Sequence, residues 1–139
     1  GAAVFNDETG EVISLGVNQV VSQHCSVAHA EVMAIMAAQQ KIENFSLQEA
    51  PYHLVSSSQP CAMCTGAIAW SGLSRLTYAA TKEDVEKLTG FDEGPLHPKW
   101  QEELEKRGIS TSANLLRAEA CQTLQYYKDN AGLVYNGRS

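Results

Sequence analysis

Two short stretches decide the interpretation of this 139-residue chain, His29-Ala30-Glu31 and Pro60-Cys61-Ala62-Met63-Cys64. Each stands at the beginning of an apolar run with helical spacing. Together they offer one imidazole, two thiols and one carboxylate, which amounts to three metal ligands and a spare acid or base. We therefore predict a metal centre held between the beginnings of two helices.

The ligand types favour a zinc ion with one open coordination position. Cys61 and Cys64 are three residues apart, which on a helix places both sulfurs on one face near the positive end of the helix dipole. With His29 they make three protein ligands, and the fourth corner is left to water, as in catalytic zinc sites. Glu31 could carry a proton from that water, whose pKa on zinc falls to about 7. Residues two apart on a straight helix point to nearly opposite sides, so spacing alone does not place Glu31 beside His29.

Other interpretations of the same residues remain open at this point. Cys25 could be a fourth ligand and close a structural zinc site. Two cysteines three apart are also typical of a redox motif, in which His29 and Glu31 would have no task. Glu31 alone could be a solvated acid that favours a helix N-terminus. Cys121 lies inside the last expected helix and is expected to pack as a small hydrophobic residue.

Composition limits the class of protein. Hydrophobic residues make up 44% of the chain, yet no apolar run approaches the ~20 residues of a membrane span, so we expect a single domain over residues 1–139. No cationic segment followed by an apolar stretch opens the sequence, which favours a cytoplasmic location. The net charge of −6 and the scattered Lys and Arg residues argue against a nucleic-acid or membrane surface.

Helices and strands are expected to alternate along most of the chain. The patterns predict strands at residues 3–5, 11–15, 52–55, 75–80 and 109–116, and helices at 28–41, 61–70, 82–88, 99–107 and 118–129. The first two strands are joined by turn-forming residues and should pair as a hairpin. The breaker-rich stretch 90–98 should be a loop, which is where site residues often lie. Such alternation favours an α/β fold around a layered sheet.

With both motifs in place, the chain resembles the cytidine deaminase-like superfamily of zinc deaminases, whose signature pairs H-x-E with P-C-x-x-C. Within it, the chain is most similar to the bacterial guanine deaminases. The resemblance runs from residue 1 to about residue 127 and rests on stretches 28–31 and 60–70, together with Gly90-Phe91-Asp92-Glu93. It implies a three-layer α/β/α sandwich with a central mixed sheet of about five strands. It also implies a Zn²⁺ cofactor, a small purine base as substrate, and a homodimer whose C-terminal tail reaches the partner's site.

The resemblance assigns roles residue by residue. Glu31 would relay protons and Glu93 would be a second proton shuttle or purine anchor; a solvated loop acid is the alternative for Glu93. Substrate-binding roles are implied for Asn18 at the base edge, Trp70 on the pocket wall, Phe91 and Tyr135 over the purine, and Ala30 between the motif residues. The alternatives are a turn residue for Asn18, core packing for Trp70 and an unstructured tail for Tyr135.

The expected reaction is hydrolysis of guanine to xanthine and ammonia, with attack of an activated water on C2. Cytosine or a triazine would suit the same chemistry, and a tRNA adenosine deaminase is the main enzymatic rival, although its substrate calls for a basic face. The alternative from another functional class is a non-catalytic interaction module whose fold is stabilised by zinc. It predicts four protein ligands.

The sequence departs from the family pattern in two places. Gln59 stands where relatives have Glu before Pro-Cys-x-x-Cys, which puts any charge at that position in doubt. Relatives also carry an N-terminal helix and a Pro-Phe pair ahead of the stretch that matches residues 1–4. We therefore expect a fragment, or further preceding residues, and an exposed sheet face or site wall where that helix would pack.

Overall fold

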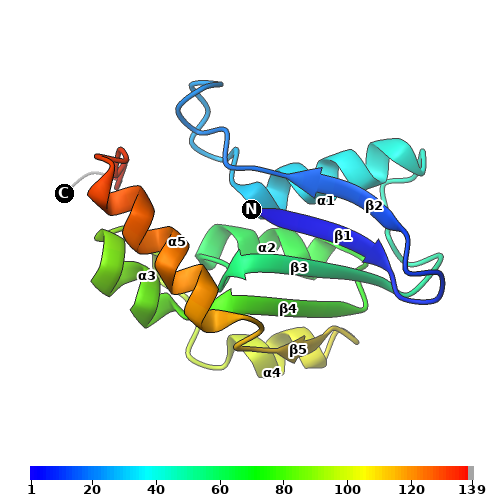
Figure 1. Ribbon diagram of the computed structural model, residues 1–139. Coiled ribbons are helices and arrows are strands. Elements are labelled where there is room, and N and C mark those ends of the chain that lie inside the picture. The colour runs from blue at the N-terminus through cyan, green and yellow to red at the C-terminus, as the bar shows by residue number, and fades with distance from the viewer. Residues whose placement is uncertain (138–139) are drawn as a thin grey trace.

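The computed structural model describes residues 1–137, which form a five-stranded mixed sheet with helices on both faces (Figure 1). β1 (Ala2–Asn6) and β2 (Val12–Gly16) form an antiparallel hairpin, and β3 (Tyr52–Ser58) pairs antiparallel with the other edge of β1. β4 (Arg75–Ala80) runs parallel to β3, and β5 (Ser110–Ser112) runs parallel to β4. The strand order is therefore β2-β1-β3-β4-β5.

The helices complete a three-layer arrangement. α1 (Ala30–Lys41) and α2 (Ala62–Ser71) lie behind the sheet as drawn in Figure 1, and α4 (Trp100–Glu105) packs on the same face. α5 (Arg117–Asp129) crosses the opposite face beside α3 (Lys82–Thr89). This confirms the expected α/β class, the mixed sheet and the layered packing.

The hydrophobic core lies between the sheet and the layer of α1, α2 and α4. Val4, Leu54 and Leu76 point into it from successive strands, and each is fully buried. Ile68 of α2 and Leu104 of α4 meet them from the helices and are also buried. These strands thus hold the helices that carry the metal motifs against a rigid surface. Within residues 1–137, no helix combines the length and apolar character that crossing a membrane would require.

The outer face of the sheet is covered unevenly. Thr77 and Ala79 of β4 lie under α5 and are buried, whereas Leu15 of β2 is 72% exposed. No residue of α5 is buried, so the contact between this helix and the sheet lacks a hydrophobic core like that of the inner layer. The inner layer therefore provides most of the packing that fixes the site.

Two predicted strands differ from the structure by more than one residue at an end. The strand expected at 52–55 continues to Ser58, because β1 and β4 pair with it on both edges and supply its ladder. The strand expected at 109–116 is only the three residues of β5. Asn114 and Leu116 adopt left-handed backbone conformations, with φ of 67° and 50°, which end extended pairing before the predicted limit.

Candidate active site

His29 and Cys61 each lie immediately before a helix rather than in its first turn. His29 is the N-cap residue of α1, with an extended backbone at φ −72° and ψ 156°. Cys61 is the N-cap residue of α2, at φ −64° and ψ 173°. The expected helical placement of both residues was therefore wrong by one or two positions. On a straight helix, residues two apart would point to nearly opposite sides. Because His29 is extended and only Glu31 lies within α1, this argument does not apply, and both side chains can face the same site.

The beginnings of the two helices are brought together by the sheet. Gly16, at the end of β2, lies so close to α1 that a Cβ placed on it would be 2.1 Å from the carbonyl oxygen of Ala30. Only glycine allows this approach of strand and helix. On the other side, Gln59 and the buried Pro60 follow β3 and lead into α2. The fixed φ of proline suits the start of a helix. A hairpin end and a central strand thus position the two motif segments.

The three expected ligands converge. The ligand atoms of His29, Cys61 and Cys64 all lie within 4.8 Å of one another, and Nδ1 of His29 is 3.5 Å from Sγ of Cys61. Two ligands at about 2.0 and 2.3 Å from one tetrahedral zinc ion are separated by about 3.6 Å, so this pair fits. Within residues 1–137 this is the one such group of three, and Cys25 is not part of it. The donor set therefore matches a three-ligand zinc site.

The protonation of the two thiols differs strongly in the metal-free chain. Hydrogen bonds from Cys64 and His29 lower the pKa of Cys61 to about 4, against the opposing effect of burial. The hydrogen bond to Cys61 raises the pKa of Cys64, and burial and the negative charge of Glu31 add to this. The hydrogen bond to Cys61 also raises the pKa of His29. The lowered pKa of Cys61 thus favours its thiolate, which is the form in which a cysteine binds a divalent cation.

The carboxylate of Glu31 is buried directly beside this group, with 7% of the residue exposed. Oε1 accepts a hydrogen bond of 2.9 Å from the Ser56 hydroxyl. Oε2 lies 3.4 Å from Sγ of Cys64. A buried carboxylate is costly without partners, and Glu31 has two, one of which is an expected zinc ligand. Its role as the acid or base of the site stays a prediction.

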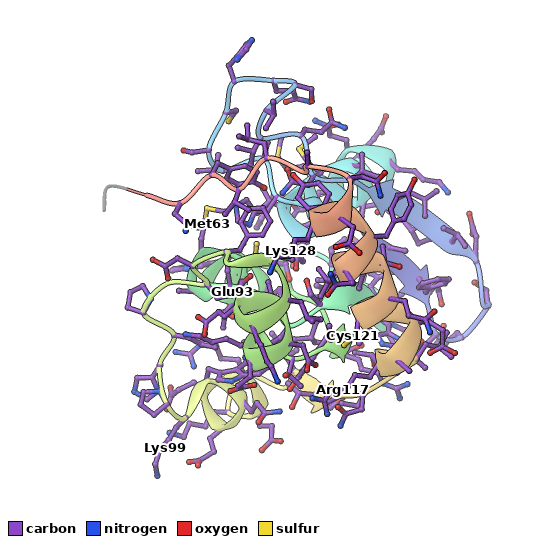
Figure 2. The ribbon with its side chains drawn as sticks, turned by 60° about the vertical axis from the view of Figure 1, so that its left-hand side comes forward. Met63, Glu93, Lys99, Arg117, Cys121 and Lys128 are labelled. Carbon is purple, nitrogen blue, oxygen red and sulfur yellow. The ribbon has the colours of Figure 1, made fainter. Side chains whose placement is uncertain are left out.

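Glu93 approaches the same group from the loop after α3. Its backbone oxygen accepts from the N–H of Ala62 at 3.1 Å, and Nζ of Lys82 donates to the neighbouring Gly94 oxygen at 3.2 Å. Figure 2 shows Glu93 on this loop, at the end of the molecule where Met63 of α2 also lies. Burial, together with the negative charges of Cys61 and Glu31, raises the pKa of Glu93 to about 7. The loop thus presents a second carboxyl group to the site.

Two aromatic side chains and the C-terminal segment lie beside the ligand set. The Tyr135 ring lies 5.0 Å from that of Phe91 and 6.4 Å from that of His29, both in edge-on geometry. Asn18 donates a hydrogen bond to the Tyr135 hydroxyl. The side chain of Asn136 bonds both the N–H of Asp92, at 2.8 Å, and the oxygen of Gly90, at 3.0 Å, and so brackets Phe91. In the single chain these contacts are all internal; the expected exchange of tails between two copies stays a prediction.

Trp70 does not join this group. It is 90% exposed near the end of α2, roughly 9 Å along the helix axis from Cys64. It borders a groove of about 600 Å³ between α2 and α4, whose lining includes Pro95, Leu96 and Trp100 but none of the zinc ligands. Its exposure rules out core packing for Trp70, and its role at the substrate stays a prediction. Ala30 is buried as the first residue of α1, and its role at the substrate stays a prediction.

Sequence reasoning missed two residues that shape the site, Ser56 and Asn136. Ser56 lies one residue beyond the strand predicted at 52–55, although it continues the alternation of Tyr52 and Leu54, and a polar residue in such a buried series can indicate a buried polar contact. Asn136 lies in the tail and carried no signal. The position of Gln59, singled out in the sequence for lacking a negative charge, lies next to the beginning of α3: its amide oxygen accepts a hydrogen bond of 3.1 Å from the N–H of Lys82, the first residue of that helix.

Comparisons with known proteins agree with this geometry. The model of a family described as the cytidine and deoxycytidylate deaminase zinc-binding region matches residues 1–80. A solved structure of guanine deaminase from Nitrosomonas europaea superposes with a TM-score of 0.89 and 44% identity, covering 92% of this chain and 71% of that one. A tRNA-specific adenosine deaminase from Buchnera aphidicola is 32% identical over 92% of this chain and 87% of its own length. Guanine deaminase from Bacillus subtilis is 34% identical over 78% of this chain and 67% of its own.

Proposed function

Since the chain belongs to the family of the cytidine and deoxycytidylate deaminase zinc-binding region, and is therefore a zinc-dependent hydrolase of C–N bonds, we propose that its substrate is guanine. Water would add to C2 of the purine, the bond to the 2-amino group would break, and xanthine and ammonia would leave. The two similar guanine deaminases support this choice of base. The tRNA adenosine deaminase among the relatives makes the base the decisive question.

The observation that carries the proposal is the presence of two carboxyl groups around one ligand set. Zinc held by His29, Cys61 and Cys64 would supply a water acidic enough to lose a proton near neutral pH. Glu31, buried against Cys64, is placed to accept that proton and to return it to the ring and the departing amine. Glu93, with a pKa near 7, can exchange a proton at neutral pH and so assist the amine in leaving.

The aromatic side chains beside the ligand set favour a free base over a nucleic acid. The Tyr135 ring lies beside His29 and against Phe91, and Asn18 donates a hydrogen bond to the tyrosine hydroxyl, so two aromatic rings lie next to the ligand set. Aromatic rings in this place suit a planar heterocycle and would help to exclude water from the reacting atoms. The net charge of −6 offers little attraction to the phosphates of a tRNA.

The test is a substrate panel with the zinc-loaded protein. Guanine, adenine, cytosine, a triazine and a tRNA are incubated separately, ammonia is measured in every case, and xanthine is measured for guanine. We expect release from guanine at a rate well above the others. Glu31→Gln is the matched control, since it keeps the shape and is expected to lower kcat by about a hundred- to ten-thousandfold. Deamination of tRNA or cytosine in preference to guanine would disprove the proposed substrate.

A further inference from the structure

The carboxylate of Glu31 has two hydrogen-bond donors, and they differ in kind. Among residues 1–137, these are the Ser56 hydroxyl on Oε1, at 2.9 Å, and the Cys64 thiol on Oε2, at 3.4 Å. The serine bond is short and joins a neutral donor to an anion, which makes it one of the stronger classes of hydrogen bond. The thiol is a weak donor. The serine therefore contributes more to holding the carboxylate.

The two donors also differ in what happens when the metal site is formed. A cysteine binds zinc as the thiolate, so Cys64 has no proton left to donate as a ligand. Ser56 touches none of the three ligands by a hydrogen bond and keeps its proton. Of the two protein donors to Glu31, the serine is thus the one that persists with zinc bound.

Ser56 is mounted rigidly. It lies on the central strand β3, paired with Ala2 of β1 on one side and Tyr78 of β4 on the other, and only 3% of it is exposed. It extends the buried series of Tyr52 and Leu54 on the inner face of the strand. Water cannot readily replace its hydroxyl there, and the strand cannot shift without breaking two ladders.

We infer that Ser56 is a positioning residue that fixes the orientation of the Glu31 carboxylate. With Oε1 held by the serine, rotation of the carboxylate is stopped and Oε2 stays directed at the ligand set. A group that must take up and release a proton in a fixed geometry gains rate from such restraint. This inference rests on the proposed deaminase chemistry, and it adds a requirement for one hydroxyl outside the motifs.

The kinetic test compares Ser56→Ala with Ser56→Thr, which restores the hydroxyl. We expect Ser56→Ala to lower kcat by about ten- to a hundredfold, as for the loss of a hydrogen bond to a charged group, with KM changed by less than about twofold. Ser56→Thr should recover most of kcat. In a Glu31→Gln background, Ser56→Ala should have little further effect, because the two residues would act as one unit.

Ser14→Ala is the matched control for a merely structural role. Ser14 is also a buried serine that bonds α1, through a 2.7 Å hydrogen bond to the oxygen of Ala34, but it does not touch Glu31. Ser14→Ala should lower the thermal stability about as much as Ser56→Ala does and leave kcat unchanged. Equal losses of kcat in both variants would overturn the inference.

Two readouts do not depend on the substrate. Zinc content should be one per chain in the wild type and in Ser56→Ala; loss of zinc would mean that the serine supports the ligands and would overturn the inference. Crystal structures of the two zinc-loaded proteins should show a single carboxylate orientation at Glu31 in the wild type and a rotated one in the variant. An unchanged orientation would also overturn it. If the wild type deaminates no base in the panel, the proposed function fails, and these structures still decide the role of Ser56.

Discussion

The metal site and the outer face of the sheet each contain a bonded histidine, yet only the first is suited to catalysis. On the outer face, Nδ1 of His53 lies 3.1 Å from Asp7, and Nε2 lies 2.8 Å from the Thr77 hydroxyl. That hydroxyl in turn contacts Ser112 at 2.7 Å. The acid, imidazole and hydroxyl are the residue types of a catalytic triad, in the order that a triad requires.

The difference lies in how completely the polar atoms are partnered. Asp7 is further neutralised by Arg75 at 3.3 Å, so the outer cluster forms a balanced chain that runs from the turn after β1 across β3, β4 and β5. In the metal site, two thiols and two carboxyl groups share one imidazole; hydrogen bonds lower the pKa of Cys61 and raise that of Cys64, and burial raises the pKa of Glu93. A balanced cluster stabilises the sheet, whereas an unbalanced one can bind a cation and move protons. The residue types alone do not separate the two.

The largest expected effect comes from removing one zinc ligand. Cys64→Ser should abolish stoichiometric zinc binding and lower kcat/KM by about a thousandfold or more, since a bound metal supplies several kcal/mol of transition-state stabilisation. Metal analysis and the xanthine assay measure both. Cys121→Ser is the control, because Cys121 lies on α5 (Figure 2) and does not belong to the group of ligand residues. Full zinc occupancy in Cys64→Ser would contradict the assignment of this ligand.

Removal of the second carboxyl group should have a smaller effect. Glu93→Gln is expected to lower kcat by about a hundredfold, at the low end for general acid–base catalysis, and to leave zinc content unchanged. The neighbouring Asp92→Asn also removes one negative charge but keeps an acceptor for the N–H of Gly94. It should retain nearly full activity. Equal activity of Glu93→Gln and Asp92→Asn would remove Glu93 from the mechanism.

On the outer face, a change should alter stability and its pH dependence but not the reaction. His53→Gln is expected to lower the free energy of unfolding by about 1–2 kcal/mol at pH 7.5, through lost hydrogen bonds. Burial lowers the pKa of His53, with Asp7 opposing and Arg75 adding to this shift. The folded state therefore binds fewer protons than the unfolded state just below the ordinary pKa of about 6.5.

The sign of the pH dependence follows from this difference. The contribution of neutral His53 is complete above about pH 6.5 and is lost as the pH falls through the lowered folded value. The stability gap between wild type and His53→Gln should thus be largest at pH 7.5 and shrink towards pH 5. Urea unfolding of both proteins across this range measures it, and kcat should be equal at pH 7.5. A gap that widens on acidification would refute the assigned shift.

The smallest effect is expected at the end of the outer cluster. Ser112 is exposed on the edge strand β5, so water can replace its contact with Thr77. Ser112→Ala should change the free energy of unfolding by less than about 0.5 kcal/mol, as at most surface positions. Thermal unfolding with the activity assay checks this. A loss as large as that of His53→Gln would show that the cluster acts as one unit.

Much of the fold could be predicted from local pattern. Apolar spacing placed all five helices and four strands within a few residues, because their buried faces repeat with the period of the element. The length of β5 was overestimated, because the left-handed conformations of Asn114 and Leu116 end the strand without changing the pattern of apolar residues. The ligand residues were also identified in advance, because few residue types bind zinc and their spacing is distinctive.

The surroundings of the ligands could not be predicted in the same way. Ser56 meets Glu31 across 25 positions of sequence, and Asn136 reaches Gly90 across 46. Such contacts depend on the order of the strands and the path of the tail, neither of which is encoded in a local pattern. For the same reason, Trp70 was expected at the site on the strength of its neighbours in sequence but lies exposed beside a different groove.

The sequence by itself determined which atoms can bind the metal and which acid accompanies them, because donor chemistry belongs to the side chains themselves. Only the tertiary structure decided that His29 and Cys61 precede their helices, that Glu31 faces the thiols, and that a serine on the central strand holds it. The physical reason is that orientation and desolvation arise from packing between distant segments. The chemical groups of a side chain determine which reactions it can take part in, whereas its orientation and its pKa depend on the groups that the fold places around it.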